Sequence, residues 1–68
     1  MIQLNKQYRH FKGNIYIPLH IGRDSETEQE VVIYQNIKHN DIWVRPISMW
    51  DEIIDEKGTR RFTLIEEE

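Results

Sequence analysis

Apolar and polar residues alternate along residues 14–21, and this alternation predicts a β-strand. Every second residue is a branched aliphatic one, and the positions between them include Tyr16, Pro18 and His20. A period of two is typical of a strand with one face in the core, and a proline inside it indicates a sheet edge or a bulge. The run 31–37 is β-branched and aromatic on both faces, which predicts a central strand.

Turn-forming residues divide the rest of the chain into short elements. A polar loop follows the first strand, and Gly58 marks a second hairpin turn because glycine adopts positive φ angles readily. The predicted elements, in order after the loop at 22–30 and the central strand, are a turn at 38–41, a strand at 42–45, one helical turn at 47–50, a short strand through 53–54, a turn at 55–59 and a closing strand at 60–65.

Four to five short antiparallel strands with a one-turn helix near residues 47–50 predict an all-β fold, a small SH3-like partly open barrel. No segment supplies the two amphipathic helices that a ferredoxin-like fold requires. The side chains predicted to point inward are Ile15, Ile17, Leu19, Val31, Ile33, Ile42, Val44, Phe62 and Leu64. An aspartate in place of Ile33 is therefore expected to unfold the domain.

The 68 residues predict a single domain over 1–68, with a frayed acidic tail at 66–68. A chain of this length buries only about 60% of the surface that its unfolded form exposes. It has no cysteine, so neither a disulfide nor a thiolate metal site can stabilise it. Trp43, Trp50, Tyr34 and Ile47 exceed what one small core can bury, so we expect a homodimer or a higher homo-oligomer.

No apolar run approaches the roughly 20 residues that span a bilayer, and the start of the chain has no signal-peptide pattern. We therefore expect a soluble, cytoplasmic protein with no membrane partner.

The charges are unevenly distributed along the chain. The net charge is −3, from 12 acids and 9 bases, and this sign argues against long nucleic acid as a partner. Residues 1–23, however, hold four bases and no acid. This asymmetry indicates a local anion site, and a solvated surface with chance asymmetry is the alternative.

Four segments of the chain, "YRHFKGNIY", "SETEQEVVIY", "WVRPISMW" and "RRF", occur in that order between residues 8 and 62. Together they resemble the small bacterial and phage family called Domain of Unknown Function 1653. The sequence departs from the family pattern at Asp24, where the family has histidine, and at Trp50, where it has phenylalanine. The resemblance implies a compact β fold and no agreed activity.

Cationic and aromatic residues of the first segment and of the strand at 42–45 form the candidate binding site. Planar rings stack on bases, and guanidinium groups bind phosphate through two parallel hydrogen bonds. We therefore predict a non-enzymatic module that binds a small phosphate-bearing, nucleotide-type ligand, and sequestering a nucleotide signal is the use such a module would have in a phage. The predicted ligand-binding residues are Tyr8, Arg9, His10, Lys12, Trp43 and Arg45.

Each of these residues also has a purely structural interpretation. Tyr8 and Phe11 could pack in the core or as a lid over the open end of the barrel. Arg45 could form an ion pair with Glu26 or Glu30 that holds the long loop. A docking adaptor of SH3-like type, with the exposed aromatics binding a proline-rich peptide, is the second functional alternative.

Neither a metal, a cofactor nor an enzymatic activity is predicted. The histidines at 10, 20 and 39 match no zinc-binding spacing, and neither serine lies in a nucleophile elbow. A small metal-independent ribonuclease is the one enzymatic alternative. His10, Glu26 or Glu30, and Arg45 would then supply its base, its acid and its cationic stabiliser.

Overall fold

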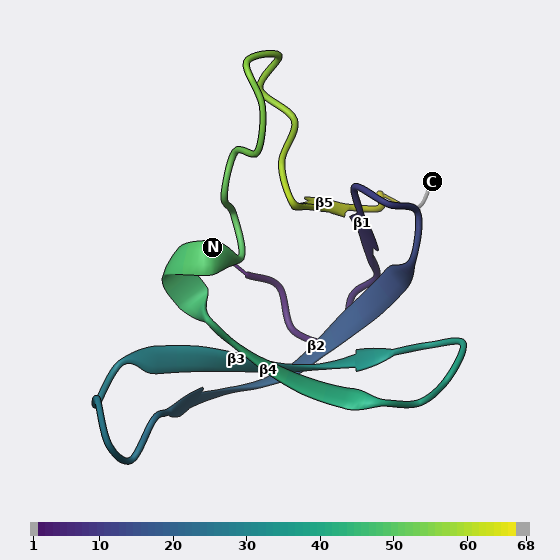
Figure 1. Ribbon diagram of the computed structural model, residues 1–68. Helices are drawn as coiled ribbons and strands as arrows, with labels where there is room; N and C mark the ends of the chain where they lie inside the picture. Colours follow the sequence, from purple (N-terminus) through teal and green to yellow (C-terminus); the bar gives the residue numbers. More distant parts are fainter. Residues whose placement is uncertain (1, 67–68) are drawn as a thin grey trace.

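Five antiparallel strands form one open sheet in the computed structural model of the protein, which describes residues 2–66 (Figure 1). The strands are β1 (Tyr8–His10), β2 (Ile15–Arg23), β3 (Glu30–Asn36), β4 (Ile42–Pro46) and β5 (Phe62–Leu64), and their order in the sheet is β4-β3-β2-β1-β5. One 3₁₀ turn, η1 (Ile47–Met49), follows β4 directly. The predicted all-β class and the one-turn helix are confirmed. Of the acidic tail, residues 67–68 lie outside the described part of the chain.

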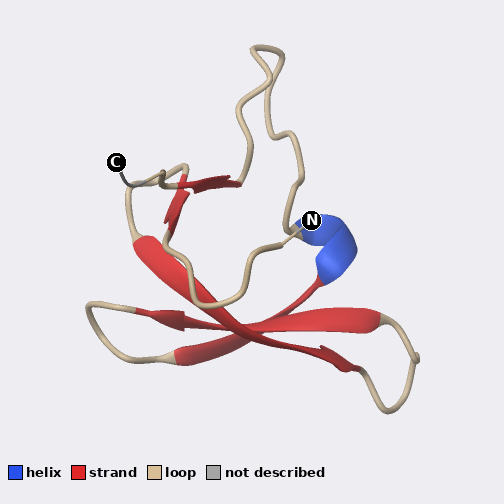
Figure 2. Ribbon diagram, turned by 180° about the vertical axis from the view of Figure 1, so that it is seen from behind, coloured by secondary structure: helices blue, strands red, loops and turns tan. Residues whose placement is uncertain are grey.

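The sheet curls because β2 belongs both to the β2–β3–β4 ribbon and to the pairing that leads through β1 to β5. The start of β2 pairs with β1, at Tyr8 and Tyr16, and nearly its whole length pairs with β3. β1 and β5 therefore rise above one face of the β2–β3–β4 ribbon, and η1 lies above the same face (Figures 1 and 2). The core fills the space between these two parts, as expected of a partly open barrel.

Two short elements differ from the sequence prediction. β1 was not predicted, because three residues are too few to show a periodic pattern; it is held by pairing with β2 on one side and with β5 on the other. The predicted short strand at 53–54 is only an isolated bridge between Ile53 and Arg60. The hairpin that contains this bridge therefore extends from the sheet instead of joining it (Figure 1).

Pro18 lies in a central strand beside a β-bulge. The pairing between β2 and β3 shifts register between Pro18 and His20, so Leu19 is the extra residue. Pro18 itself is buried, and its carbonyl accepts a hydrogen bond of 2.8 Å from the backbone N–H of Asn5. A bulge is one of the few places where a central strand tolerates proline. The sequence allows either a sheet edge or a bulge at Pro18, and the structure has a bulge.

Aromatic rings dominate the core. Trp50 is fully buried and stacks on Phe62, with the ring centroids 3.9 Å apart, and Tyr8 and Tyr34 meet Trp50 edge-on at 5.3 and 5.1 Å. Val32, which is also fully buried, completes the cluster. Edge-to-face contacts of this kind stabilise aromatic pairs beyond the area that they bury.

The predicted inward face is wrong for the central ribbon. Residues directly opposite each other share a face of the sheet, and Tyr34 and Val32 lie opposite Trp43 and Arg45. The aromatic face is therefore the inner one. Of the residues predicted to point inward, Val31 and Phe62 are buried, Leu64 packs against the core, Ile15, Ile17, Leu19 and Ile33 are half-buried, and Ile42 and Val44 are exposed.

The reason for this error is that both faces of the strands are apolar. Alternation alone does not tell which of two apolar faces is buried. The aromatic face buries the larger side chains, and its hydroxyl groups find partners: Tyr8 accepts a hydrogen bond from the backbone N–H of Gln3, at 2.9 Å, and Tyr34 accepts one from Arg45. Val32, not Ile33, is the fully buried residue of this pair. A buried charge is therefore expected to unfold the domain at Val32.

Among residues 2–66, no helix is long and apolar enough to cross a membrane.

Candidate functional site

Arg45 extends from the inner face of β4 across the rim of the aromatic core. Its Nε donates a hydrogen bond of 3.4 Å to the hydroxyl of Tyr34, and its guanidinium carbon lies 5.8 Å from the centroid of the Phe62 ring. The side chain is half-buried. Within the described chain Arg45 forms no ion pair with Glu26 or Glu30, so that structural interpretation of Arg45 is wrong.

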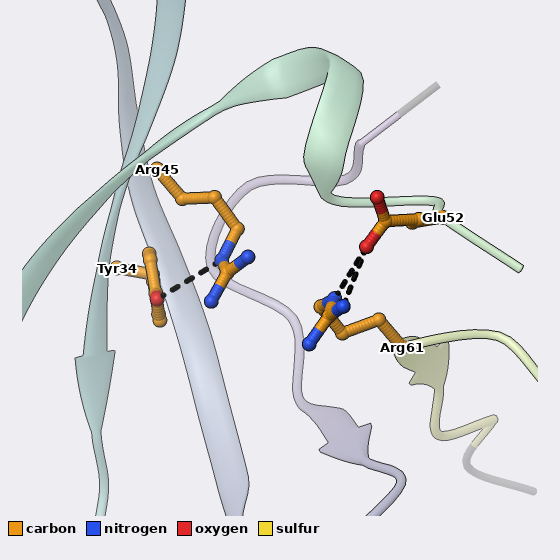
Figure 3. Close-up of polar contacts among 4 residues, drawn as sticks. All are labelled: Tyr34, Arg45, Glu52 and Arg61. Atoms are coloured by element: carbon orange, nitrogen blue, oxygen red, sulfur yellow. Dashed lines mark hydrogen bonds and ion pairs between the residues drawn. The ribbon is translucent and has the colours of Figure 1, made fainter. Parts of the chain in front are cut away.

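Arg61 approaches the same place from the start of β5. Its Nε and Nη2 donate hydrogen bonds of 3.0 and 2.5 Å to one carboxylate oxygen of Glu52, on the other arm of the projecting hairpin. Its guanidinium carbon is 5.8 Å from the centroid of the Phe11 ring. Figure 3 shows the guanidinium groups of Arg45 and Arg61 extending toward each other from opposite sides.

His10 lies at the end of β1, and its ring packs against three aromatic rings. Its ring centroid is 4.5 Å from that of Phe11, 5.0 Å from that of Phe62 and 6.0 Å from that of Tyr16. Its Nδ1 accepts a hydrogen bond of 3.2 Å from the backbone N–H of Lys12. Because Nδ1 is the acceptor, the neutral imidazole carries its proton on Nε2, which can donate a hydrogen bond to a ligand.

The electrostatic surroundings lower the pKa of His10. Partial burial is the largest cause, and the positive charges of Arg61, Arg45 and Lys12 each lower this pKa further. A histidine gains a proton less readily where cations already surround it. We call His10, Lys12, Arg45 and Arg61 the arginine cluster; it is a local concentration of positive charge in an acidic protein.

We expect His10 to titrate below its usual pKa of 6.5. Because the folded state disfavours the charged imidazole, this group should lower the stability of the protein as the pH falls from 6.5 through the folded-state pKa. Arg45→Ala should move the pKa of His10 upward, since one of the repelling charges is lost. The imidazole proton resonances of the wild type and the variant, followed by NMR against pH, measure both values. A wild-type pKa of 6.5 or higher would contradict the cluster geometry.

The structure brings together three of the residues predicted to bind the ligand: His10, Lys12 and Arg45. Lys12 is exposed on the rim, with its ammonium nitrogen 5.8 Å from the centroid of the Phe11 ring. Trp43 is half-exposed and shares the inner side of β4 with Arg45, two residues along the strand. Its ring is therefore placed beside the cluster instead of inside it.

Tyr8 and Arg9 are placed differently from the arginine cluster. Tyr8 is only 5% exposed, so its ring offers no free face to a base. Arg9 occupies the opposite face of β1 from Tyr8 and His10, because successive side chains of a strand alternate. It lines a shallow depression whose wall also includes His10, Phe11 and Arg60, so Arg9 borders the cluster without belonging to it.

Arg61 and Phe11 were not predicted to bind a ligand, although both belong to the cluster's surroundings. Phe11 is 43% exposed, and its backbone N–H donates to the carbonyl of Arg61 at 2.9 Å, which ties the loop after β1 to the start of β5. Both residues lie in the segments that carry the family resemblance, "YRHFKG" and "RRF". Their position in these two segments is the one sequence feature that could have pointed to Arg61 and Phe11. The sequence alone does not show that the two segments meet in the fold.

The acid required by the ribonuclease alternative is not near His10. β1 pairs with the start of β2, at Ile15 and Tyr16, whereas Glu26 and Glu30 follow the far end of that strand, at Arg23. Seven residues of strand separate Tyr16 from Arg23, which is about 23 Å at 3.3 Å per residue. Among residues 2–66, the carboxylate that forms an ion pair with the cluster is that of Glu52, which binds Arg61.

Asp24, which stands where the family has histidine, closes a turn. One oxygen of its carboxylate accepts hydrogen bonds from the backbone N–H groups of Glu26 and Thr27, at 2.8 and 3.1 Å. These two donors lower the pKa of Asp24, the Glu26 bond having the larger effect. Histidine is not required at this position to hold the loop. In the part of the chain that is described, no group of three histidine or acidic residues could hold a metal ion.

Comparison with known proteins places the chain in a family. No curated protein and no solved structure matches the chain. A family model, described as Protein of unknown function (DUF1653), matches residues 6–64, a span that includes all five strands and every residue of the arginine cluster. This match confirms the resemblance found in the four sequence segments. The chain therefore belongs to the DUF1653 family of proteins of unknown function.

Proposed function

We propose that the protein is a non-enzymatic module that binds a small phosphate-bearing, nucleotide-type ligand at the arginine cluster. The observation that carries this proposal is that Arg45, from β4, and Arg61, just before β5, extend toward each other (Figure 3), and that both lower the pKa of His10. Holding like charges together is unfavourable unless an anion offsets them. Glu52 offsets Arg61 alone among these cations in the described chain.

The cations of the cluster suit a phosphate group in geometry as well as in charge. Guanidinium groups form paired, charge-assisted hydrogen bonds with phosphate oxygens. Among residues 2–66, Arg45 uses only its Nε, in one long hydrogen bond, so its terminal nitrogens are left to bind a ligand. His10 adds an Nε2 donor, and Lys12 adds an exposed positive charge at the rim.

Two partly exposed rings beside the cluster support a nucleotide, instead of inorganic phosphate, as the proposed ligand. Phe11 is 43% exposed and contacts His10, and Trp43 is 51% exposed on the same side of β4 as Arg45. Stacking of a base on an aromatic ring contributes about 1–3 kcal/mol. The net charge of −3 disfavours a long polyanion, so the ligand is a small one, and retaining it without turnover would sequester it.

Calorimetry with a panel of mono-, di- and cyclic nucleotides tests this function. We expect at least one nucleotide to bind, with an affinity that falls as salt rises, because the attraction is electrostatic. No binding of any nucleotide in the panel would contradict the proposal. Binding of a proline-rich peptide without salt dependence would favour the docking adaptor, and consumption of the nucleotide over time would favour the ribonuclease.

A further inference from the structure

The shallow depression beside β1 and β5, which we call the Arg9 depression, is basic. Among residues 2–66 its wall contains Arg9 and Arg60 and no acidic residue. Arg9 lies directly opposite Thr63 in the pairing of β1 with β5, so their side chains share one face of the sheet. The volume of the depression is about 370 Å³, which is within the range of small-molecule sites.

The charges of the two arginines in the Arg9 depression are not offset by a carboxylate. Among residues 2–66, the side chain of Arg9 takes part in no hydrogen bond and no ion pair. Arg60 donates to the backbone carbonyl of Asp51, at 3.1 Å, and this bond positions the guanidinium group without placing an anion beside it. Two cations in one depression repel each other unless an anion binds there. Guanidinium groups and the hydroxyl of Thr63 are donors that phosphate oxygens accept.

His10 and Phe11 connect the Arg9 depression with the arginine cluster. Both residues line the depression, and their ring centroids are 4.5 Å apart. The ammonium nitrogen of Lys12 and the guanidinium carbon of Arg61 each lie 5.8 Å from the centroid of the Phe11 ring. The ring of Phe11, which is 43% exposed, therefore has two cations of the cluster near it and the Arg9 depression beside it.

A tight turn holds Phe11 in this position. The backbone N–H of Gly13 donates to the carbonyl of His10 at 2.7 Å, and Gly13 has a φ of 104°, which glycine adopts readily. The backbone N–H of Phe11 donates to the carbonyl of Arg61 at 2.9 Å. The two basic regions are thus held at a fixed separation, and such preorganisation lowers the cost of binding a ligand that contacts both.

We propose that the Arg9 depression binds a second phosphate group of the same ligand, so that the ligand is a nucleotide with phosphates at two separate positions of its nucleoside. One phosphate binds the arginine cluster, the other binds Arg9 and Arg60, and the nucleoside lies over Phe11 between them. Nucleoside 3′,5′-bisphosphates have this arrangement, whereas the two phosphates of a nucleoside 5′-diphosphate are adjacent. This inference rests on the proposed function, because the cluster holds the first phosphate.

Calorimetry with matched pairs of nucleotides tests the inference. The 3′,5′-bisphosphate and the 5′-diphosphate of adenosine, guanosine, cytidine and uridine are compared at constant salt, since the two members of each pair carry the same number of phosphates. For the base that binds best, we expect the bisphosphate to bind the wild type roughly tenfold or more tightly than the diphosphate, the scale of a hydrogen bond to a charged group.

Arg9→Ala and Arg60→Ala should each reduce this preference for the bisphosphate severalfold, because each removes a donor to the second phosphate. Arg23→Ala is the matched control. Arg23 is exposed at the far end of β2 and its loss removes the same charge, so the preference should stay at its wild-type value.

Equal affinities for the two nucleotides, a preference that Arg9→Ala leaves unchanged, or the same loss of preference in Arg23→Ala would each overturn the inference. The arginine cluster would then remain a site for a single phosphate position. If neither nucleotide bound with any of the four bases, the proposed function would be contradicted, and the inference would fail with it.

Discussion

Aspartate in place of Val32 is expected to unfold the protein, whereas the same replacement at Val44 should leave it folded. Val32 is fully buried in the aromatic core and Val44 is 63% exposed. An unpaired carboxylate in an apolar core costs several kcal/mol. At about 0.05–0.15 kcal/mol per residue, a chain of this size has roughly 3–10 kcal/mol of stability in total. The cost at Val32 is therefore comparable to the whole free energy of unfolding.

Chemical denaturation at a low protein concentration measures this contrast. The fluorescence of Trp50, which is buried against Phe62, reports on the core directly. The Val32→Asp variant should show the exposed-tryptophan signal without denaturant, and Val44→Asp should retain a transition close to that of the wild type. A folded Val32→Asp variant or an unfolded Val44→Asp variant would show that the inner face has been assigned incorrectly.

Removal of either cluster arginine is expected to weaken nucleotide binding by about 1.5–3 kcal/mol, the scale of a hydrogen bond to a charged group. This corresponds to a loss of roughly 10- to 150-fold in affinity. Arg45→Ala and Arg61→Ala should have effects of this size because both guanidinium groups face the same space. Glu52→Gln should strengthen binding, since it removes a negative charge that is paired with Arg61.

Arg23→Ala is the matched control for these variants. Arg23 is exposed at the end of β2 that lies far from β1, and it donates to the backbone carbonyl of Glu28, at 2.7 Å. Its loss changes the net charge of the protein by the same amount without altering the cluster. Calorimetry should therefore give the wild-type affinity for Arg23→Ala. Equal losses in all three arginine variants would indicate a general effect of charge instead of a defined site.

Most of the fold could be predicted from the sequence. The alternation in β2, the β-branched run of β3 and the turn before β4 are local signals, and the structure follows them. Local sequence does not decide which face of the sheet is buried, because β2, β3 and β4 carry apolar side chains on both faces. The bulge at Leu19 adds a further change of face that no periodic pattern shows.

The same distinction applies to the candidate site. Arg45, His10 and Lys12 could be predicted because each lies in a short segment with an unusual mixture of charges and rings. Arg61 joins them only through the pairing of β1 with β5, a contact between residues far apart in the sequence. Tyr8 is buried in the aromatic core, which is the structural interpretation that the sequence also allows for it.

Chemical-shift mapping by NMR tests the central claim most directly. Two-dimensional spectra would be recorded as the tightest nucleotide of the panel is added, with the side-chain Nε–H signals of Arg45 and Arg61 resolved. The proposal predicts that these two signals and the imidazole of His10 move the most, and that the pKa of His10 rises as the bound phosphate offsets the surrounding cations. Shifts that avoid all three residues, or no shift with any nucleotide, would contradict it.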